Sequence, residues 1–209
     1  MEGYNSVTNN ESAEQIIEKS RFIALVAQIK NISEVDQHMQ EVQREYPNAR
    51  HYVYAYRLHE GRLEKASDDG EPQGTGGRPV LDLLQHKQVW DVQIIVVRYF
   101  GGVLLGTGGL TRAYGGTARL ALEKAGITKL QPHHVYTLKI PYPWYEQIKY
   151  GLRQRGWEND HEQFLAEITF DVYIPEGEEK GFENWVDEFT GQQVLREKID
   201  VILKRNKNQ

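Results

Sequence analysis

The stretch from residue 92 to residue 125 constrains the fold more than any other part of the chain. It opens with an apolar, β-branched run at 92–97, continues through a glycine-rich loop and closes with apolar residues at helical spacing. It holds seven of the chain's nineteen glycines and three arginines, with no acidic residue between positions 93 and 122. This pattern predicts a buried strand, a loop and a helix, and therefore a fold of mixed α and β structure.

The same stretch is locally basic, although the chain as a whole is acidic. The net charge of −5 argues against non-specific binding of nucleic acid through bulk positive charge. Between residues 72 and 122, five basic residues nevertheless face two acidic ones, a local charge of +3 (5 − 2). The basic residues are Arg78, Lys87, Arg98, Arg112 and Arg119. An anion is therefore the class of ligand that this stretch favours.

The absence of cysteine excludes a disulfide framework, a thiolate zinc site, a cysteine nucleophile and a disulfide-linked partner. The first fifteen residues lack the basic and apolar regions of a signal peptide, and no apolar run is long enough to span a bilayer. With 39% hydrophobic and 26% charged residues, the composition is that of a globular protein. We expect a cytoplasmic protein that makes no membrane contact.

Two α+β domains are predicted, covering residues 1–134 and 135–209. In the first, the stretches 19–30 and 51–58 have strand patterns, and Ser33 begins a helix between them. The glycine, aspartate and proline content of 60–77 is typical of a loop, and Pro79 suits the first turn of a short helix.

After residue 134 the pattern restarts as a self-contained unit. Strand patterns at 135–140, around 156–157, at 166–174 and at 194–203 are interrupted by two helices. Phe182, Trp185, Val186 and Phe189 mark the second helix, which Gly191 stops. The order β-α-β-β-α-β is the ferredoxin-like split βαβ pattern.

The glycine-rich loop has the ingredients of an anion site without a known phosphate fingerprint. Gly106, Gly108 and Gly109 do not complete the dinucleotide-binding pattern, and no Gly-Lys-Ser or Gly-Lys-Thr follows. Free N–H groups, a helix N-terminus and nearby arginines can still hold an anion. The alternative is that the glycines serve tight packing and turns. The candidate anion-binding residues are Arg98, Gly101, Gly102, Gly108, Gly109, Arg112, Gly116 and Arg119.

Arg112, Gly116 and Arg119 share one face of the predicted helix. A glycine between two arginines leaves bare backbone that a phosphodiester or another protein's main chain can approach, and each guanidinium offers fork-like donors. The alternative is that Gly116 lets another element of the same domain pack closely, while Arg119 pairs with Glu123.

Asp68, Asp69 and Glu71, together with Arg78, form a candidate supporting loop. Carboxylates suit Mg²⁺, but the Asp-Asp-Gly-Glu-Pro sequence lacks calcium-loop spacing and no histidine pair has zincin spacing. The alternative is that these acids are solvated or are partners for Arg78 or Arg98. We therefore predict no metal site, no cofactor and no catalytic residue.

Several motifs of the chain resemble those of the Impact family, in particular of its bacterial two-domain members. The likeness extends over essentially the whole chain. It is carried by Lys19-Ser20-Arg21-Phe22, by Ser67-Asp68-Asp69-Gly70-Glu71-Pro72 with Gly74-Thr75-Gly76-Gly77-Arg78-Pro79, and by Val97-Arg98-Tyr99-Phe100-Gly101-Gly102 running into Leu105-Gly106-Thr107-Gly108-Gly109-Leu110 and Arg112-Ala113-Tyr114.

The resemblance implies a first domain like the second domain of the fifth small-subunit ribosomal protein. It implies a second domain like the last domain of elongation factor G, which is ferredoxin-like. The family is named for a eukaryotic protein that binds an activator of a translation-factor kinase and so modulates translation. That role belongs to members with an additional N-terminal domain, so binding to the activator is not carried over. Leu104 stands where some relatives have lysine, which removes one phosphate contact.

The leading hypothesis is a non-catalytic RNA- or ribosome-associated protein involved in regulation of translation. One alternative is a magnesium-dependent enzyme acting on a phosphorylated small molecule, because the first domain's fold also occurs in small-molecule kinases. Another is a pure protein-interaction module. An exposed basic groove around residues 101–119 favours a polymer ligand, a closed pocket favours a small one, and full burial favours neither.

Overall fold

The computed structural model describes residues 2–191 and 193–205, which divide into two compact units. The first unit is Tyr4–Thr128, and the second contains the chain from Lys129 on. The division falls at residue 128, within the long strand β7 (Ile127–Ile140), whereas the sequence predicts a boundary at residue 134. Gly126 ends the preceding helix two residues before the division, and a single strand, which contains Pro132, runs through the division itself.

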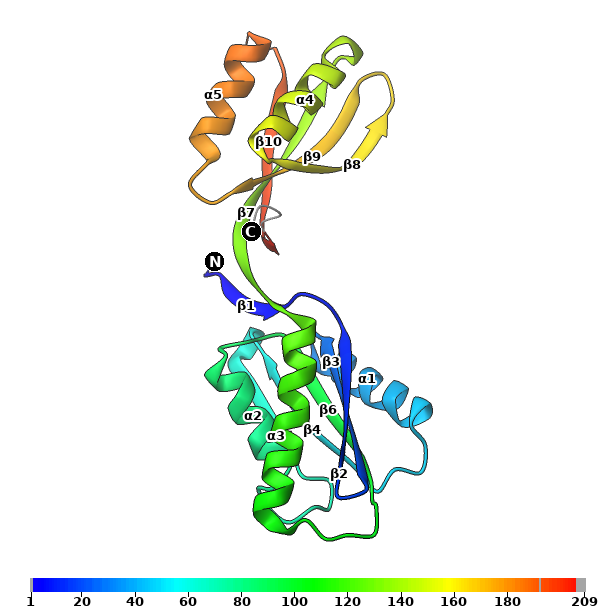
Figure 1. Ribbon diagram of the computed structural model, residues 1–209. Helices are drawn as coiled ribbons and strands as arrows, with labels where there is room; N and C mark the ends of the chain where they lie inside the picture. The colour runs from blue at the N-terminus through cyan, green and yellow to red at the C-terminus, as the bar shows by residue number, and fades with distance from the viewer. Residues whose placement is uncertain (1, 192, 206–209) are drawn as a thin grey trace. The chain divides into compact units, whose positions relative to one another are not determined.

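The first unit is built on an antiparallel sheet in the order β2-β3-β6-β4-β5. Its strands are β2 (Glu11–Ile17), β3 (Ser20–Gln28), β4 (His51–Leu58), β5 (Leu63–Ser67) and β6 (Val92–Tyr99). A short strand, β1 (Tyr4–Val7), precedes them, and a 3₁₀ turn, Glu60–Arg62, links β4 to β5. Since β6 lies at the centre of the sheet, the glycine-rich loop that follows it starts from the middle of the domain (Figure 1).

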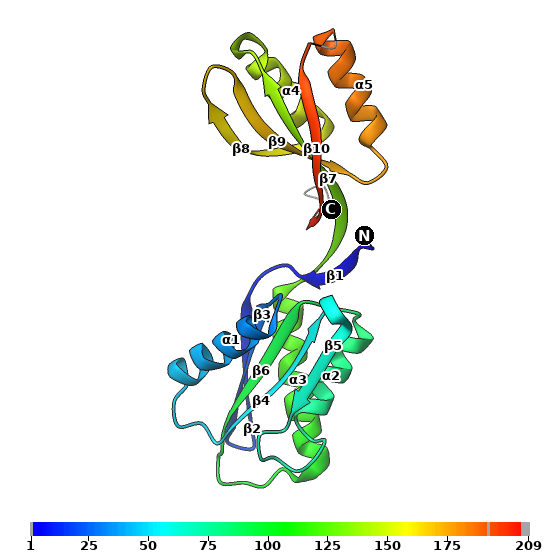
Figure 2. The ribbon, with the colours of Figure 1, turned by 180° about the vertical axis from the view of Figure 1, so that it is seen from behind.

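Helices cover both faces of this sheet. Helices α2 (Gly77–His86) and α3 (Gly106–Ala125) lie on one face, and α1 (Ile32–Glu45) lies on the other (Figures 1 and 2). The side chains of β6 are buried on both sides: Ile94 and Val96 belong to the core beneath α2 and α3, while Ile95 and Val97 pack in the cluster that includes Val42 of α1. This double burial explains the unbroken apolar run of the strand.

The second unit has the predicted order β-α-β-β-α-β. Its antiparallel sheet has the order β10-β7-β9-β8, from β8 (Glu158–Phe164), β9 (Ile168–Pro175) and β10 (Leu195–Arg205) beside β7. A 3₁₀ turn, Tyr142–Trp144, leads into α4 (Tyr145–Arg155), and α5 (Glu179–Thr190) connects β9 to β10. The ferredoxin-like pattern is confirmed, and α5 ends at Gly191 in the left-handed conformation, as predicted.

The core of the second unit lies between its sheet and its two helices. Leu138 and Phe170 of the sheet meet Leu152 of α4 and Phe182 of α5 in one buried cluster. At its edge the Trp157 and Trp185 rings lie 5.7 Å apart. The core is thus complete within this unit.

Two local predictions differ from the structure. The 60–77 stretch contains the strand β5 as well as a loop, because β5 is an edge strand whose side chains are largely exposed and lack an apolar alternation. The sequence also predicts that Thr107 or Thr111 caps the helix after the glycine-rich loop, but α3 begins at Gly106 without a side-chain cap. The Thr111 hydroxyl instead donates to the Thr107 carbonyl within the helix, at 3.1 Å.

Candidate anion-binding groove

A groove of about 500 Å³ lies between α2 and α3, within the first unit. Both helices contribute to its walls, and it is open to solvent. A smaller hollow of about 160 Å³ shares Leu83, Lys87 and Arg119 with it and continues along α3 to Gly126 and Ile127. The groove is lined by Pro79, Asp82, Leu83, His86, Lys87, Thr111, Arg112, Gly115, Gly116 and Arg119.

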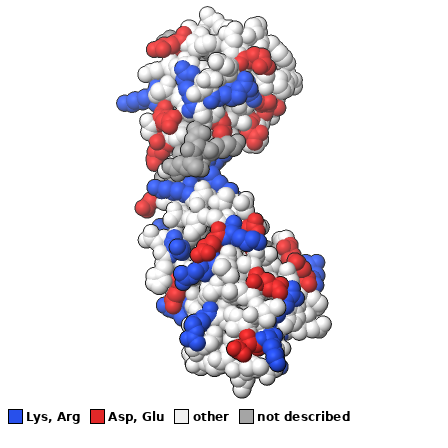
Figure 3. Space-filling model, in the orientation of Figure 1, with Lys and Arg blue, Asp and Glu red and all other residues white. Residues whose placement is uncertain are grey.

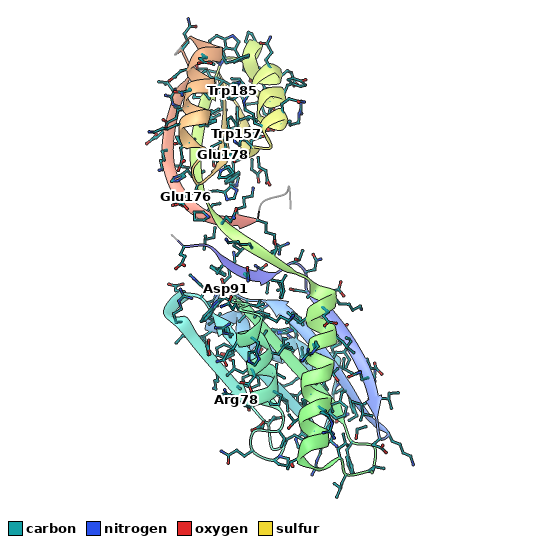
Figure 4. All side chains as sticks on the ribbon, turned by 60° about the vertical axis from the view of Figure 1, so that its left-hand side comes forward. Arg78, Asp91, Trp157, Glu176, Glu178 and Trp185 are labelled. Atoms are coloured by element: carbon teal, nitrogen blue, oxygen red, sulfur yellow. The ribbon has the colours of Figure 1, made fainter. Side chains whose placement is uncertain are left out.

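The charge of the groove is dominated by three cations. Arg112 and Arg119 from α3 and Lys87 from the end of α2 are exposed, and none of them forms an ion pair with any described residue. Arg119 therefore does not pair with Glu123 in this structure. Asp82 is the acidic residue among those lining the groove, and its carboxylate is bound by Arg78 at 2.7 Å. Lysine and arginine side chains lie over this face of the unit in Figure 3, and Figure 4 labels Arg78 on α2.

The floor of the groove includes two helical glycines that packing does not require. A methyl group on Gly115 would lie 3.5 Å from Cβ of Pro79, and one on Gly116 would lie 3.6 Å from Oε1 of Gln15. Both distances are ordinary van der Waals contacts. Each glycine costs about 1 kcal/mol relative to alanine in a helix interior. The packing of the domain therefore does not explain the two glycines. Bare backbone of this kind allows an external group to approach the helix closely.

Arg98 lies apart from the groove, inside the fold. Its Nη1 donates to Oε1 of Glu71 at 2.5 Å, and both side chains are buried. The Tyr114 hydroxyl donates to the same carboxylate oxygen at 2.7 Å, and the Ser20 hydroxyl lies 3.4 Å from Nη2 of Arg98. Burial, and then the hydrogen bond to Glu71, raise the pKa of Tyr114 far above its ordinary value, so this hydroxyl remains a donor. The Arg98 guanidinium is thus engaged by the domain itself.

The 68–77 loop is held by its own acids. The Asp68 carboxylate accepts the N–H groups of Gly74, Gly76 and Gly77 at 2.7 to 2.9 Å and so occupies the N-terminus of α2. Burial raises the pKa of Asp68, but the three backbone donors outweigh it, and the net shift is downward. The Asp69 carboxylate accepts the Tyr52 N–H at 2.6 Å. Glu71 is thus a partner of Arg98, as the alternative interpretation proposes, whereas Asp68 and Asp69 accept backbone N–H groups, which neither interpretation predicted.

Gly101 is a packing residue at the start of the glycine-rich loop. A Cβ there would lie 2.0 Å from the Lys19 carbonyl carbon, so a side chain would collide with the turn between β2 and β3. Its N–H also donates to the Ser20 hydroxyl at 3.1 Å. Gly102 lies in the exposed part of the loop, while Gly108 and Gly109 lie in the first turn of α3 and do not line the groove.

The structure therefore separates the predicted residues. Arg112, Gly116 and Arg119 come together in the groove; Arg98, Gly101 and Glu71 lie in or against the core, and Asp69 is exposed. Sequence reasoning missed the other wall. Asp82 and His86 lie four residues apart on the polar side of α2, and Lys87 directly follows His86. This spacing is the signal that could have found them.

Two kinds of feature are absent from the part of the chain that the structure describes. Among the described residues, no three histidine, aspartate or glutamate side chains are grouped so that they could hold a metal ion. Over the same residues, none of the helices has both the length and the apolar character needed to cross a membrane.

Comparison with known proteins identifies the family. A family model described as the Impact N-terminal domain matches residues 18–122, which include the whole groove and the Arg98–Glu71 pair. The IMPACT family member YvyE of Bacillus subtilis is 32% identical over 191 residues, or 91% of this chain and 88% of that protein. This chain belongs to the IMPACT family.

Other relatives of this IMPACT family chain agree. Residues 138–193 match a domain of unknown function, DUF1949. The IMPACT family member YigZ of Escherichia coli is 35% identical over 162 residues, covering 76% of this chain and 79% of that one. A crystal structure of a hypothetical protein, 30% identical, has a TM-score of 0.61 and covers 96% of this chain and 98% of its own. The family resemblance and the two-domain α+β class are thereby confirmed.

Proposed function

We propose that this IMPACT family chain is a non-catalytic, RNA-binding protein that associates with the ribosome and takes part in regulation of translation. The observation that carries the proposal is the groove between α2 and α3, which is open, lined by three cations without ion-pair partners among the described residues, and floored by bare backbone. An open basic groove suits a polymer whose charges repeat along its length.

Each side chain of the groove has a distinct role in this proposal. The Arg112 and Arg119 guanidinium groups donate in pairs to phosphate oxygens, and the Lys87 ammonium acts as a compact positive charge on the opposite wall. Gly115 and Gly116 let the sugar–phosphate backbone approach α3 closely. Arg98, which is held by Glu71, fixes the end of β6 from which the glycine-rich loop starts.

The two alternative functions have less support. An enzyme that uses Mg²⁺ through the loop acids would have to release Asp68 from three N–H groups and Glu71 from Arg98. A pure protein-interaction module would use the same groove, and binding measurements separate it from the RNA hypothesis.

The test is binding of the full-length chain to a structured RNA, measured by fluorescence anisotropy over a series of salt concentrations, together with co-sedimentation with ribosomes. Arg112→Ala with Arg119→Ala should weaken binding at least tenfold and reduce the slope of log K against log salt by about 1 per arginine. Arg44→Ala, an exposed arginine on α1, removes the same type of charge from the opposite face of the sheet and should change little. Binding that is absent, or unchanged in the double variant, contradicts the proposal.

A further inference from the structure

We infer that the groove takes the sugar–phosphate backbone of double-stranded RNA, not the bases of a single strand. This inference rests on the proposed function and adds the form of the RNA. Three observations support it: the cations of the groove, the lack of Phe, Tyr and Trp among its lining residues, and the carboxylates on the open face of the sheet in the second unit.

The groove offers bases little to stack on. None of its ten lining residues is Phe, Tyr or Trp, and His86 is the single imidazole among them. Tyr114 is on the same helix but is fully buried, and Tyr54 and Tyr56 pack against the cores on the α1 side of the sheet. Proteins that hold single strands combine a basic channel with aromatic side chains for successive bases. A single strand in this groove could stack only on His86 or on the guanidinium groups that its phosphates also engage.

Two of the three cations are carried by a helix. Arg112 and Arg119 are seven residues apart on α3, so their Cα atoms are separated by about 10 Å along the helix axis. Lys87 caps the C-terminus of α2 and lines the other wall of the groove. A duplex presents its phosphates in a fixed array, so it can meet this fixed set of cations without first being ordered. A flexible single strand loses conformational entropy when its backbone is fixed in the groove.

The duplex also matches the bare floor of the groove. Double-stranded RNA is recognised through its shape and through phosphate and 2′-hydroxyl contacts, because its bases are largely inaccessible to side chains. A projecting sugar–phosphate strand can approach the backbone at Gly115 and Gly116, where a methyl group would make only ordinary van der Waals contacts with Pro79 and Gln15. The space at these two positions is therefore available to a ligand.

The second unit does not supply the missing single-strand platform. In ferredoxin-like RNA-binding domains, aromatic residues on the open face of the sheet stack the bases. Here the register places Glu197, Thr137, Asp171 and Asp160 in one row across β10, β7, β9 and β8. These residues alternate along their strands with the core residues Leu138, Phe170 and Val172, so the row lies on the face away from the helices. The row presents carboxylates, of which Asp171 is paired with His161, and the Tyr173 ring on the same face is buried under Lys204, so no base can stack on it.

The experiment compares one 20-base-pair RNA duplex with each of its two unpaired strands, chosen without self-complementarity. Affinities are measured by fluorescence anisotropy at one salt concentration, for the unmodified chain, for Arg112→Ala with Arg119→Ala, for Lys87→Ala and for the control Arg44→Ala. We expect the duplex to bind at least tenfold more tightly than either strand, the groove variants to lose this preference, and the control to keep it.

The outcomes separate the two proposals. Single strands that bind as tightly as the duplex, with the same dependence on Arg112 and Arg119, overturn the duplex inference and leave the proposed function intact. Failure of all three RNAs to bind overturns the proposed function itself. A duplex preference that survives in every groove variant also overturns the inference, since it would place the duplex site elsewhere.

Discussion

The Arg98 guanidinium contacts the Glu71 carboxylate at 2.5 Å inside the first unit, where the exposed fractions of the two side chains are 6% and 4%. The pair joins the 68–77 loop to the end of β6, and Tyr114 of α3 donates to the same carboxylate. Residues from three separate sequence motifs thus meet at one buried acid. The family motifs therefore include residues that hold the first unit together from the inside.

Glu71→Gln should destabilise the first unit by about 3–5 kcal/mol, because it leaves the Arg98 charge buried without its partner. Urea-induced unfolding, together with hydrogen exchange of the β6 amides, measures the effect. Asp82→Asn is the matched control, since it breaks the exposed pair with Arg78 and should cost less than about 1 kcal/mol. A loss for Glu71→Gln no larger than that of the control would contradict the structural role.

Gly115→Ala and Gly116→Ala should each stabilise α3 by about 1 kcal/mol, because the added methyl group fits and alanine favours the helix. The same substitutions should weaken RNA binding by obstructing the floor of the groove. Thermal unfolding and anisotropy measure the two effects. Gly181→Ala in α5, where no atom lies within 4 Å of the added carbon, is the control that should leave RNA binding unchanged. Stabilisation without loss of binding would show that the floor is not used.

Asp82→Asn should strengthen RNA binding several-fold, because it removes the acidic residue of the groove and releases Arg78. The dependence of affinity on salt should also become steeper, since one more cation is available to phosphate. Asp36→Asn on α1 makes the same change of charge on the other side of the sheet. Equal gains in both variants would indicate bulk electrostatics and not the groove.

Asp68→Asn should reduce the sensitivity of the fold to acid. The pKa of Asp68 is lowered in the folded chain. Its carboxylate therefore stabilises the fold at pH values above the ordinary pKa of 3.8, and this stabilisation is lost as the pH falls through the lower folded pKa. The free energy of unfolding should therefore fall less steeply below about pH 4 in the variant than in the unmodified chain. Parallel curves for the two proteins would contradict the assignment.

The parts of the fold that could be predicted are those with a strong local pattern. The continuous apolar run of β6 and the alternation of β9 identify buried strands directly. Strands β2 and β5 lie at the edges of the sheet, where few side chains are buried, and their sequences carry little periodic signal. Edge strands are defined by their neighbours more than by their own residues.

The candidate site was predictable on one wall and not on the other. Helical spacing brings Arg112, Gly116 and Arg119 together within one element, whereas Lys87 joins them only because α2 packs beside α3. The pairing of Arg98 with Glu71 was one of the alternatives left open for the loop acids, and a separation of 27 residues in the sequence could not decide it. Both are tertiary contacts, which spacing along the chain does not encode.

The row of carboxylates on the second unit has a kinetic consequence. Long-range electrostatic forces act before contact, so this row disfavours the approach of a polyanion to the second unit, whereas the cations at α2 and α3 attract one to the first. The bias acts mainly on the rate of association and fades as salt screens it. Under the proposed function, fewer encounters with RNA would then be lost to unproductive orientations.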